Sequence, residues 1–222
     1  MMKALILCAG RGERLRPLTD RTPKPLVPVG GRCLLEHHIL ALRAAGLTQL
    51  VVNVSHLGDQ IERFVGDGSR WDVQIRVSRE GEIPLETGGG MLHALPLLGP
   101  EPFLVVNGDV YCDYPFAALV GRGLPHRLHL VLVPNPPHNP NGDFGLDNGL
   151  LTNTPRFTYS GIGVYPPGLL RGQDPGQFSV VPLIRQWAER GAASAELFRG
   201  LWHDVGTPGR LDQLRELLGG SD

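Results

Sequence analysis

An apolar run near the start of the chain ends in a glycine-spaced turn rich in cations. Residues 4–9 are apolar, and Gly10-Arg11-Gly12-Glu13-Arg14 follows at once. A buried strand that ends in a glycine loop presents backbone N–H groups to phosphate. Lys24 lies between two prolines, and with Arg14 it would add positive charge on the same anion. We therefore expect a nucleotide-phosphate site formed by Gly10, Gly12, Glu13, Arg14 and Lys24.

Two common glycine loops do not fit this turn. The dinucleotide motif needs a third glycine where Leu15 stands, and the P-loop needs a Gly-Lys pair followed by Ser or Thr, which is absent. A strand followed by Gly-x-Gly alone is also consistent with a simple tight turn. The residues downstream, Arg14 and Lys24 above all, favour the phosphate site.

A carboxylate follows the apolar strand expected at 103–107. Asp109 comes directly after Val105-Val106-Asn107-Gly108. Mg²⁺ prefers one or two carboxylates together with phosphate oxygens and water, and Asp204 could supply the second carboxylate. Aspartate after a strand is also a common turn residue. Its pairing with the glycine loop favours the metal role, so we expect Mg²⁺ at Asp109 and Asp204.

Four motifs in this order resemble those of the sugar-phosphate nucleotidylyltransferases. They are Gly10-x-Gly12-x-Arg14, Pro23-Lys24-Pro25, Asn107-Gly108-Asp109 and Trp202-His203-Asp204-Val205-Gly206-Thr207, and they span nearly the whole chain. The resemblance implies a Mg²⁺-dependent enzyme that joins a sugar 1-phosphate to a nucleoside triphosphate and releases pyrophosphate. It also implies catalytic roles for Arg14, Lys24 and Asp109.

Within that family, the chain is most similar to members that transfer a uridylyl group from UTP to N-acetylmuramic acid 1-phosphate. This implies UDP-N-acetylmuramate as the product and a place in peptidoglycan recycling. Two alternatives stay open. One is transfer to another hexose 1-phosphate (glucose, mannose or N-acetylglucosamine) from UTP, dTTP or GTP. The other is a non-catalytic nucleotide-sugar sensor, although a sensor need not keep both metal carboxylates.

The segment 80–89 is expected to recognise the base, by the same resemblance. A carboxylate only accepts hydrogen bonds, so Glu80 or Glu86 would suit the N3–H of uracil or thymine. Guanine also presents N–H donors and is not excluded. Thr87 and a backbone N–H near Gly88 would complete the contacts. The alternative is that both glutamates are solvated loop charges.

Sugar recognition is expected in the second half of the chain. The resemblance assigns this role to Asn107, to Asp143 and to the backbone of Ser160 and Gly161. Many relatives carry a Glu-Lys pair before the strand at 158–165, whereas this chain has only Arg156 there. Trp202 could stack on the sugar or be a buried aromatic residue. No residue identifies itself as the partner of a lactyl carboxylate.

Alternating strand and helix patterns predict how these residues are positioned. Strands are expected at 3–8, 50–54, 73–77, 103–107, 128–133 and 158–165, and helices at 34–45, 59–65, 88–97, 180–190 and 208–218. The pattern predicts a single α/β domain, a Rossmann-like three-layer sandwich with a mostly parallel, mixed central sheet. We expect a nucleotide-binding part over about residues 1–110 and a sugar-binding part over about 111–222.

Composition excludes several classes of partner. The 222 residues carry a net charge of −1, which gives no basis for binding nucleic acid or an anionic membrane. No apolar run approaches the roughly 20 residues of a membrane span. The cysteines at 8, 33 and 112 form no CxxC pair, so we expect reduced thiols in the cytoplasm. A monomer or a weak homodimer is expected.

Overall fold

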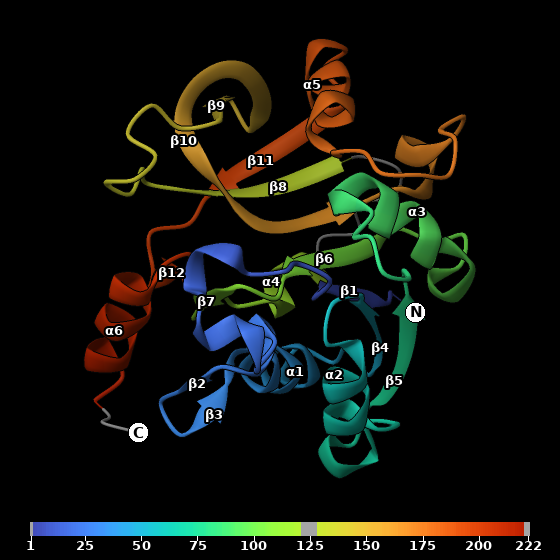
Figure 1. Ribbon diagram of the computed structural model, residues 1–222. Helices are drawn as coiled ribbons and strands as arrows, with labels where there is room; N and C mark the ends of the chain where they lie inside the picture. The colour runs from blue at the N-terminus through green and yellow to red at the C-terminus, as the bar shows by residue number, and fades with distance from the viewer. Residues whose placement is uncertain (1, 121–127, 220–222) are drawn as a thin grey trace.

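The computed structural model describes residues 2–120 and 128–219. They form one central sheet with helices around it (Figure 1). The sheet has eight strands in the order β11-β8-β10-β6-β1-β4-β5, with β9 paired to β10. Its parallel half comprises β1 (Ala4–Leu7), β4 (Gln49–Val54), β5 (Gln74–Arg79) and β6 (Phe103–Asn107). The predicted single α/β domain with a mostly parallel, mixed sheet is confirmed.

The other half of the sheet is built around one long strand. This strand, β10 (Leu150–Tyr165), runs antiparallel to β6, to β8 (Leu128–Val133), to β9 (Phe144–Asp147) and to β11 (Ala193–Leu197). It begins at Leu150, well before the strand predicted at 158–165. The reason is the β9–β10 hairpin, whose Asn148-Gly149 turn has φ values of 48° and 80°. Asn-Gly is the strongest short-range hairpin signal in a sequence.

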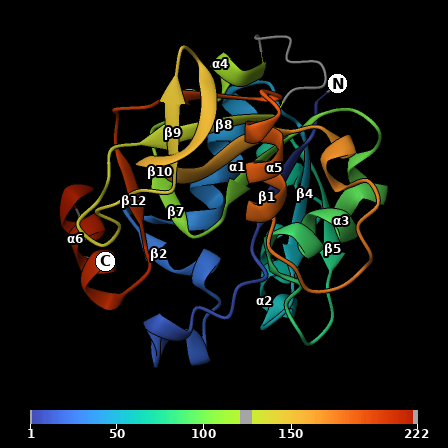
Figure 2. The same ribbon diagram turned by 90° about the horizontal axis from the view of Figure 1, so that it is seen from above.

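Helices cover both faces of the sheet, as Figures 1 and 2 show. Helices α1 (Leu34–Ala44), α2 (Gly58–Val65) and α4 (Ala117–Val120) pack on one face, and α3 (Glu86–Leu98) and α5 (Val181–Glu189) pack on the other. Strand β1 shows how its sequence sets this arrangement. Ala4 and Ile6 join the first core and Leu5 joins the second, because successive side chains of a strand point to opposite faces.

A third, smaller core ties the C-terminal helix to the N-terminal loop. Helix α6 (Pro208–Leu217) packs Leu211 and Leu214 against Leu15 and Val27. The hairpin of β2 (Pro28–Val29) and β3 (Arg32–Cys33) lies beside it. Thr207 caps α6, because its Oγ1 accepts a hydrogen bond from the backbone N–H of Arg210 at 3.4 Å. The end of the chain therefore supports the loop that carries the cationic residues.

Two short strands that the sequence did not predict join the middle of the chain to its C-terminal part. Strand β7 (Val110–Cys112) pairs antiparallel with β12 (Trp202–Asp204), and Val205 N–H donates to the Asp109 carbonyl at 3.0 Å. Each strand is too short to show a period in sequence. This pairing places the Asp204 segment beside the Asp109 segment.

Helix α3 corrects one prediction. The glycine run 88–90 was expected to start the helix, but α3 begins at Glu86 and the three glycines are buried inside it. A Cβ at Gly88 would overlap the Phe178 ring, and one at Gly89 would overlap the Gly176 carbonyl. Glycine costs about 1 kcal/mol in a helix interior. Here it permits a close approach between α3 and the segment before α5.

His38 on α1 predicts how stability changes with pH. It is 3% exposed, and its Nε2 lies 2.8 Å from the Val110 carbonyl, so this nitrogen carries the hydrogen. Burial lowers the pKa of His38 to about 4, against a smaller opposing effect of that hydrogen bond. The unfolded chain therefore takes up the proton more readily than the folded one.

We expect the stabilising contribution of His38 to be complete above pH 6.5. It should be lost as the pH falls toward 4, lowering the free energy of unfolding by about 3 kcal/mol. Urea unfolding of the wild type and of His38→Gln across this range checks it. Glutamine keeps an N–H donor without titrating, so the variant should show a flatter profile. Equal pH profiles would contradict the assignment.

Two expectations from composition can be compared with the structure. Across residues 2–120 and 128–219, no helix combines the length and apolar character needed to cross a membrane. Cys8, Cys33 and Cys112 are free cysteines, two of them buried.

Candidate active site

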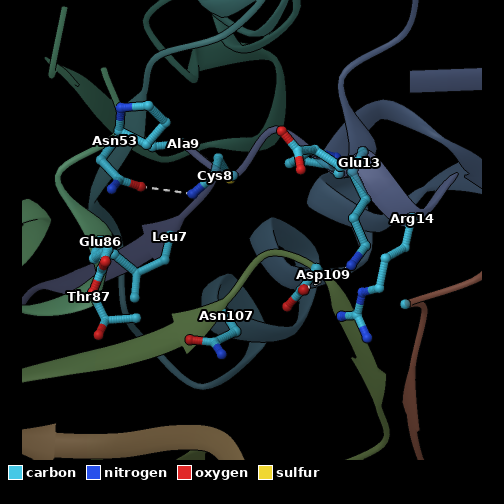
Figure 3. Close-up of a pocket in the computed structure, with 16 residues that line it drawn as sticks. Leu7, Cys8, Ala9, Glu13, Arg14, Asn53, Glu86, Thr87, Asn107 and Asp109 are labelled. Atoms are coloured by element: carbon cyan, nitrogen blue, oxygen red, sulfur yellow. Dashed lines mark hydrogen bonds and ion pairs between the residues drawn. The ribbon is translucent and has the colours of Figure 1, made fainter. Parts of the chain in front are cut away.

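A cavity of about 510 Å³ opens at the carboxyl ends of β1 and β6 (Figure 3). This is the edge at which ligands of open α/β sheets bind. Figure 3 shows Glu86 and Thr87 on one side of the cavity, with Asp109 and Arg14 on the other. The lining residues include six of the eight residues predicted to bind the nucleotide: Gly10, Gly12, Glu13, Arg14, Lys24 and Thr87. Asn107, a predicted sugar contact, and Asp109, a predicted metal ligand, also line the cavity.

The glycine loop has open space above one glycine and a tight contact at the other. A Cβ at Gly10 would meet no atom within 4 Å, whereas one at Gly12 would lie 2.9 Å from Thr19 Cγ2. Gly12 also has a φ of 65°, which favours glycine. The Thr19 hydroxyl donates to the Gly12 carbonyl at 2.8 Å and fixes the turn. The loop is therefore fixed by Thr19 at Gly12, while Gly10 borders open space and lines the cavity.

Lys24 and Asp109 form an ion pair inside the cavity. Lys24 Nζ lies 2.7 Å from Asp109 Oδ2, and the two side chains are 8% and 40% exposed. Buried prolines on both sides hold the lysine backbone. Arg14 lines the same cavity and its residue is exposed. The sequence prediction that Lys24, Asp109 and Arg14 converge on one site agrees with this geometry.

Asp204 lies next to this group without lining the cavity, although Gly206 does line it. Arg210 Nη1 donates to Asp204 Oδ2 at 3.0 Å. Asp204 Oδ1 is buried and has no hydrogen-bond partner within the described part of the chain. Buried carboxylate oxygens are normally satisfied. The free oxygen fits a divalent cation, which takes oxygen ligands.

Asn53, which was not among the predicted site residues, connects the end of β1 to the expected base segment. Its Oδ1 accepts from Cys8 N–H at 2.6 Å, the dashed line in Figure 3, and its Nδ2 donates to Glu80 Oε1. Glu80 Oε2 in turn accepts from Leu85 N–H at 2.8 Å. A polar residue within the apolar strand Leu50–Val54 was the available signal.

Comparison with known proteins places this site in a family. The model of a family described as nucleotidyl transferase matches residues 3–146. The chain belongs to the nucleotidyl transferase family.

Individual relatives of this nucleotidyl transferase differ in their stated substrates. It is 46% identical to N-acetylmuramate alpha-1-phosphate uridylyltransferase from Neisseria meningitidis, over 98% of this chain and 99% of that protein. It is 33% identical to mannose-1-phosphate guanylyltransferase catalytic subunit beta from Danio rerio, over 93% of this chain and 62% of that protein.

The fold is also shared with a solved structure. A putative glucose-1-phosphate thymidylyltransferase from Bacillus anthracis, in complex with a sucrose, superposes with a TM-score of 0.87. The alignment covers 100% of this chain and 97% of the other at 20% identity. This likeness supports the fold alone.

Two of the residues predicted to contact the base are bonded elsewhere in this nucleotidyl transferase. Both carboxylate oxygens of Glu80 accept hydrogen bonds from Asn53 and Leu85, and Glu80 does not line the cavity. The N–H of Gly88 donates to the Phe178 carbonyl at 2.9 Å, so it is not available to a base. Glu86 and Thr87 do line the cavity. The geometry therefore favours Glu86 over Glu80 as the carboxylate that faces a base.

Two of the predicted sugar contacts are occupied within the protein. Ser160 is 1% exposed, and its Oγ donates to the Val131 carbonyl at 2.7 Å and accepts from Ile162 N–H at 3.1 Å. Asp143 accepts from Asn139 Nδ2 at 3.2 Å and from Tyr159 N–H at 2.9 Å. Ser160 thus stabilises a strand junction, and Asp143 stabilises the loop before β9.

Asn107 and Gly161, two of the predicted sugar contacts, lie against each other in the structure. Asn107 lines the cavity, and a Cβ at Gly161 would come within 2.7 Å of its Cγ. Gly161 has a φ of 81° at a β-bulge in β10. Trp202 donates its indole N–H to the Ser160 carbonyl at 2.9 Å, which supports the structural alternative for this tryptophan.

Proposed function

We propose that this nucleotidyl transferase transfers a uridylyl group from UTP to N-acetylmuramic acid α-1-phosphate. The products are pyrophosphate and UDP-N-acetylmuramate, which gives the enzyme a role in peptidoglycan recycling. The observation that carries the proposal is the 46% identity with the Neisseria meningitidis uridylyltransferase over 98% of this chain and 99% of that protein. The cavity supports it with the chemistry that such a transfer needs.

The reaction brings two anions together and needs little covalent help from the protein. An oxygen of the sugar phosphate attacks the α-phosphorus of UTP, a new O–P bond forms, and the bond to the bridging oxygen of pyrophosphate breaks. Because the nucleophile is already an oxyanion, no side chain has to remove a proton from it. The work of the protein is positioning and charge stabilisation.

The charged residues of the cavity have separate parts in this proposal. The backbone of residues 10–14 surrounds the triphosphate, and Arg14 offers a fork that matches phosphate oxygens. Lys24 would exchange its contact with Asp109 for a phosphate oxygen. Both cations offset the repulsion between the two substrates and stabilise the pyrophosphate as it leaves.

Asp109 and Asp204 would hold Mg²⁺, and this assignment rests on the donor set. Asp109 lines the cavity, and Asp204 Oδ1 is a buried oxygen without a hydrogen-bond partner among the described residues. Two carboxylates with substrate phosphates and water are a typical magnesium environment. When bound, the cation would neutralise phosphate charge and orient the oxygens for in-line displacement.

Base and sugar selection decide between this activity and its nearest alternative. Glu86 faces the cavity with a carboxylate that can accept from the uracil N3–H, yet guanine also offers N–H donors. The Danio rerio relative is named a mannose-1-phosphate guanylyltransferase. The second candidate is therefore guanylyl transfer to a hexose 1-phosphate.

Pyrophosphate release across a substrate panel tests the proposal. UTP, dTTP, GTP, ATP and CTP are each paired with N-acetylmuramic, N-acetylglucosamine, glucose and mannose 1-phosphates in the presence of Mg²⁺. We expect turnover with UTP and the muramic sugar at a kcat/KM at least about 100-fold above every other pair, because a site built to pair a polar group rejects ligands that lack it. GTP with mannose 1-phosphate as the preferred pair would replace the proposal with the second candidate. No pyrophosphate from any pair would favour a nucleotide-sugar sensor.

A further inference from the structure

The carboxylate of Asp204 has partners on one oxygen only. Arg210 Nη1 donates to Oδ2 at 3.0 Å, and His138 Nε2 lies 3.3 Å from the same oxygen. Oδ1 is buried without a hydrogen-bond partner among the residues described. A carboxylate held in this way can offer only one oxygen to a further ligand. The contacts on Oδ2 therefore fix the orientation of the carboxylate and leave Oδ1 as its one oxygen without a partner among the described residues.

Arg210 itself is fixed by the first turn of α6. Its backbone N–H donates to Thr207 Oγ1 at 3.4 Å, and its carbonyl accepts from His203 Nε2 at 2.6 Å. The Arg210 side chain is only 13% exposed. The helix cap thus fixes the backbone from which this guanidinium reaches the carboxylate.

Gly206 provides the space for the guanidinium beside the carboxylate. A Cβ at this position would overlap the Arg210 guanidinium and lie 3.0 Å from Asp204 Oδ1. Gly206 also lines the cavity. Its backbone does not need a positive φ, so the requirement for glycine is one of space. Gly206 and Arg210 therefore act together on the same carboxylate.

We propose that Arg210 is a positioning residue that fixes Asp204 as a one-oxygen ligand of a divalent cation, with Gly206 leaving room for its guanidinium. The inference rests on the metal role proposed above for Asp204. Partners that orient a metal-binding carboxylate typically change metal affinity by 10- to 100-fold when they are removed. They do so because the carboxylate must otherwise be ordered at the moment the metal binds.

The sign of the effect separates positioning from simple electrostatics. A guanidinium beside a cation site repels the cation, so loss of its charge alone would strengthen metal binding. Loss of the oriented carboxylate would weaken it. The proposal requires the second effect to be the larger one.

Direct Mn²⁺ binding tests this without any substrate. Mn²⁺ alone is titrated into the full chain, and binding is followed by water-proton relaxation, with Mn²⁺ standing in for Mg²⁺. We expect Arg210→Gln to raise the Mn²⁺ dissociation constant by at least about tenfold. Arg215→Gln removes the same charge from the same helix and should leave it within twofold. An unchanged or lower dissociation constant for Arg210→Gln would overturn the proposal.

Gly206→Ala provides an independent arm that leaves every charge in place. Its methyl group should displace the guanidinium and raise the Mn²⁺ dissociation constant by a similar factor. Wild-type affinity in a folded Gly206→Ala protein would overturn the proposal, also where Arg210→Gln fails to fold by circular dichroism.

Asp204→Asn serves as the reference for complete loss of this ligand. Unchanged Mn²⁺ binding in Asp204→Asn, or no binding by the wild type, would overturn both the metal role of Asp204 and the inference that rests on it. Because no nucleotide or sugar is present, the outcome is independent of the substrate panel.

Discussion

Lys24→Met is expected to lower kcat by at least about 10³-fold while the protein stays folded. The buried ammonium is 2.7 Å from Asp109 Oδ2, and Lys24 is more buried than Arg14, which also lines the cavity. Loss of one preorganised charge donor at a reacting oxyanion costs about 10² to 10³ in rate, and Lys24 would serve both anions of this reaction. Steady-state pyrophosphate release, with the preferred pair of the substrate panel, measures the effect.

The structural cost of Lys24→Met should be small, which makes the result easy to interpret. Asp109 is 40% exposed, so its carboxylate can be hydrated once the lysine is gone. Arg16→Met is the matched control, because it removes one positive charge from the same loop. Arg16 pairs with Asp20 at 3.2 Å, outside the cavity, and should keep nearly full activity. If Lys24→Met kept kcat within tenfold of the wild type, the catalytic role of Lys24 would be wrong.

Asp109→Asn is expected to lower kcat by at least about 10²-fold and also to destabilise the protein. The substitution keeps the shape of the side chain but removes a charge that the proposed metal requires. It also leaves the Lys24 ammonium, which is 8% exposed, with a neutral partner. A hydrogen bond to a charged group contributes roughly 1 to 3 kcal/mol, and the exposure of Asp109 places the loss at the lower end.

The two substitutions should therefore differ in their effect on folding. Asp109→Asn should lower the free energy of unfolding by about 1 kcal/mol in urea, more than Lys24→Met does, because a buried ammonium is costlier to leave unpaired than a hydrated carboxylate. Asp113→Asn, four residues further along and exposed, is the control for a lost carboxylate. Full activity in Asp109→Asn, or a stability order opposite to this one, would contradict the role assigned to the pair.

Much of the fold, and of the cavity proposed to bind phosphate, was predictable from the sequence. The strands 103–107 and 128–133 were predicted at their observed bounds, because apolar strands between turn residues are local signals. Gly10, Lys24 and Asp109, each of which follows or flanks a strong local pattern, line the same cavity. In a parallel sheet, the carboxyl ends of neighbouring strands meet at one edge, so local patterns were enough to bring them together.

The tertiary structure decided which polar groups are free to act. The Ser160 carbonyl and the Gly88 N–H are suitable groups, but the first accepts from the Trp202 indole and the second donates to the Phe178 carbonyl. Sequence spacing cannot show such partners. Asn53 follows three apolar residues of its strand, and only the folded structure shows its contacts with Cys8 and Glu80.

Asp204 shows most clearly what the sequence predicts and what only the tertiary structure decides. Its motif was legible in the sequence, but its place beside Asp109 depends on the three-residue strands β7 and β12, which pair across about ninety residues of chain. Its free oxygen depends on Arg210, which α6 brings back to it. The sequence alone determined the layered sheet, the glycine loop and the identity of the charged residues. Only the packing of distant segments decided which of their atoms remain unpaired, because hydrogen-bond partners are set by distances in the folded chain.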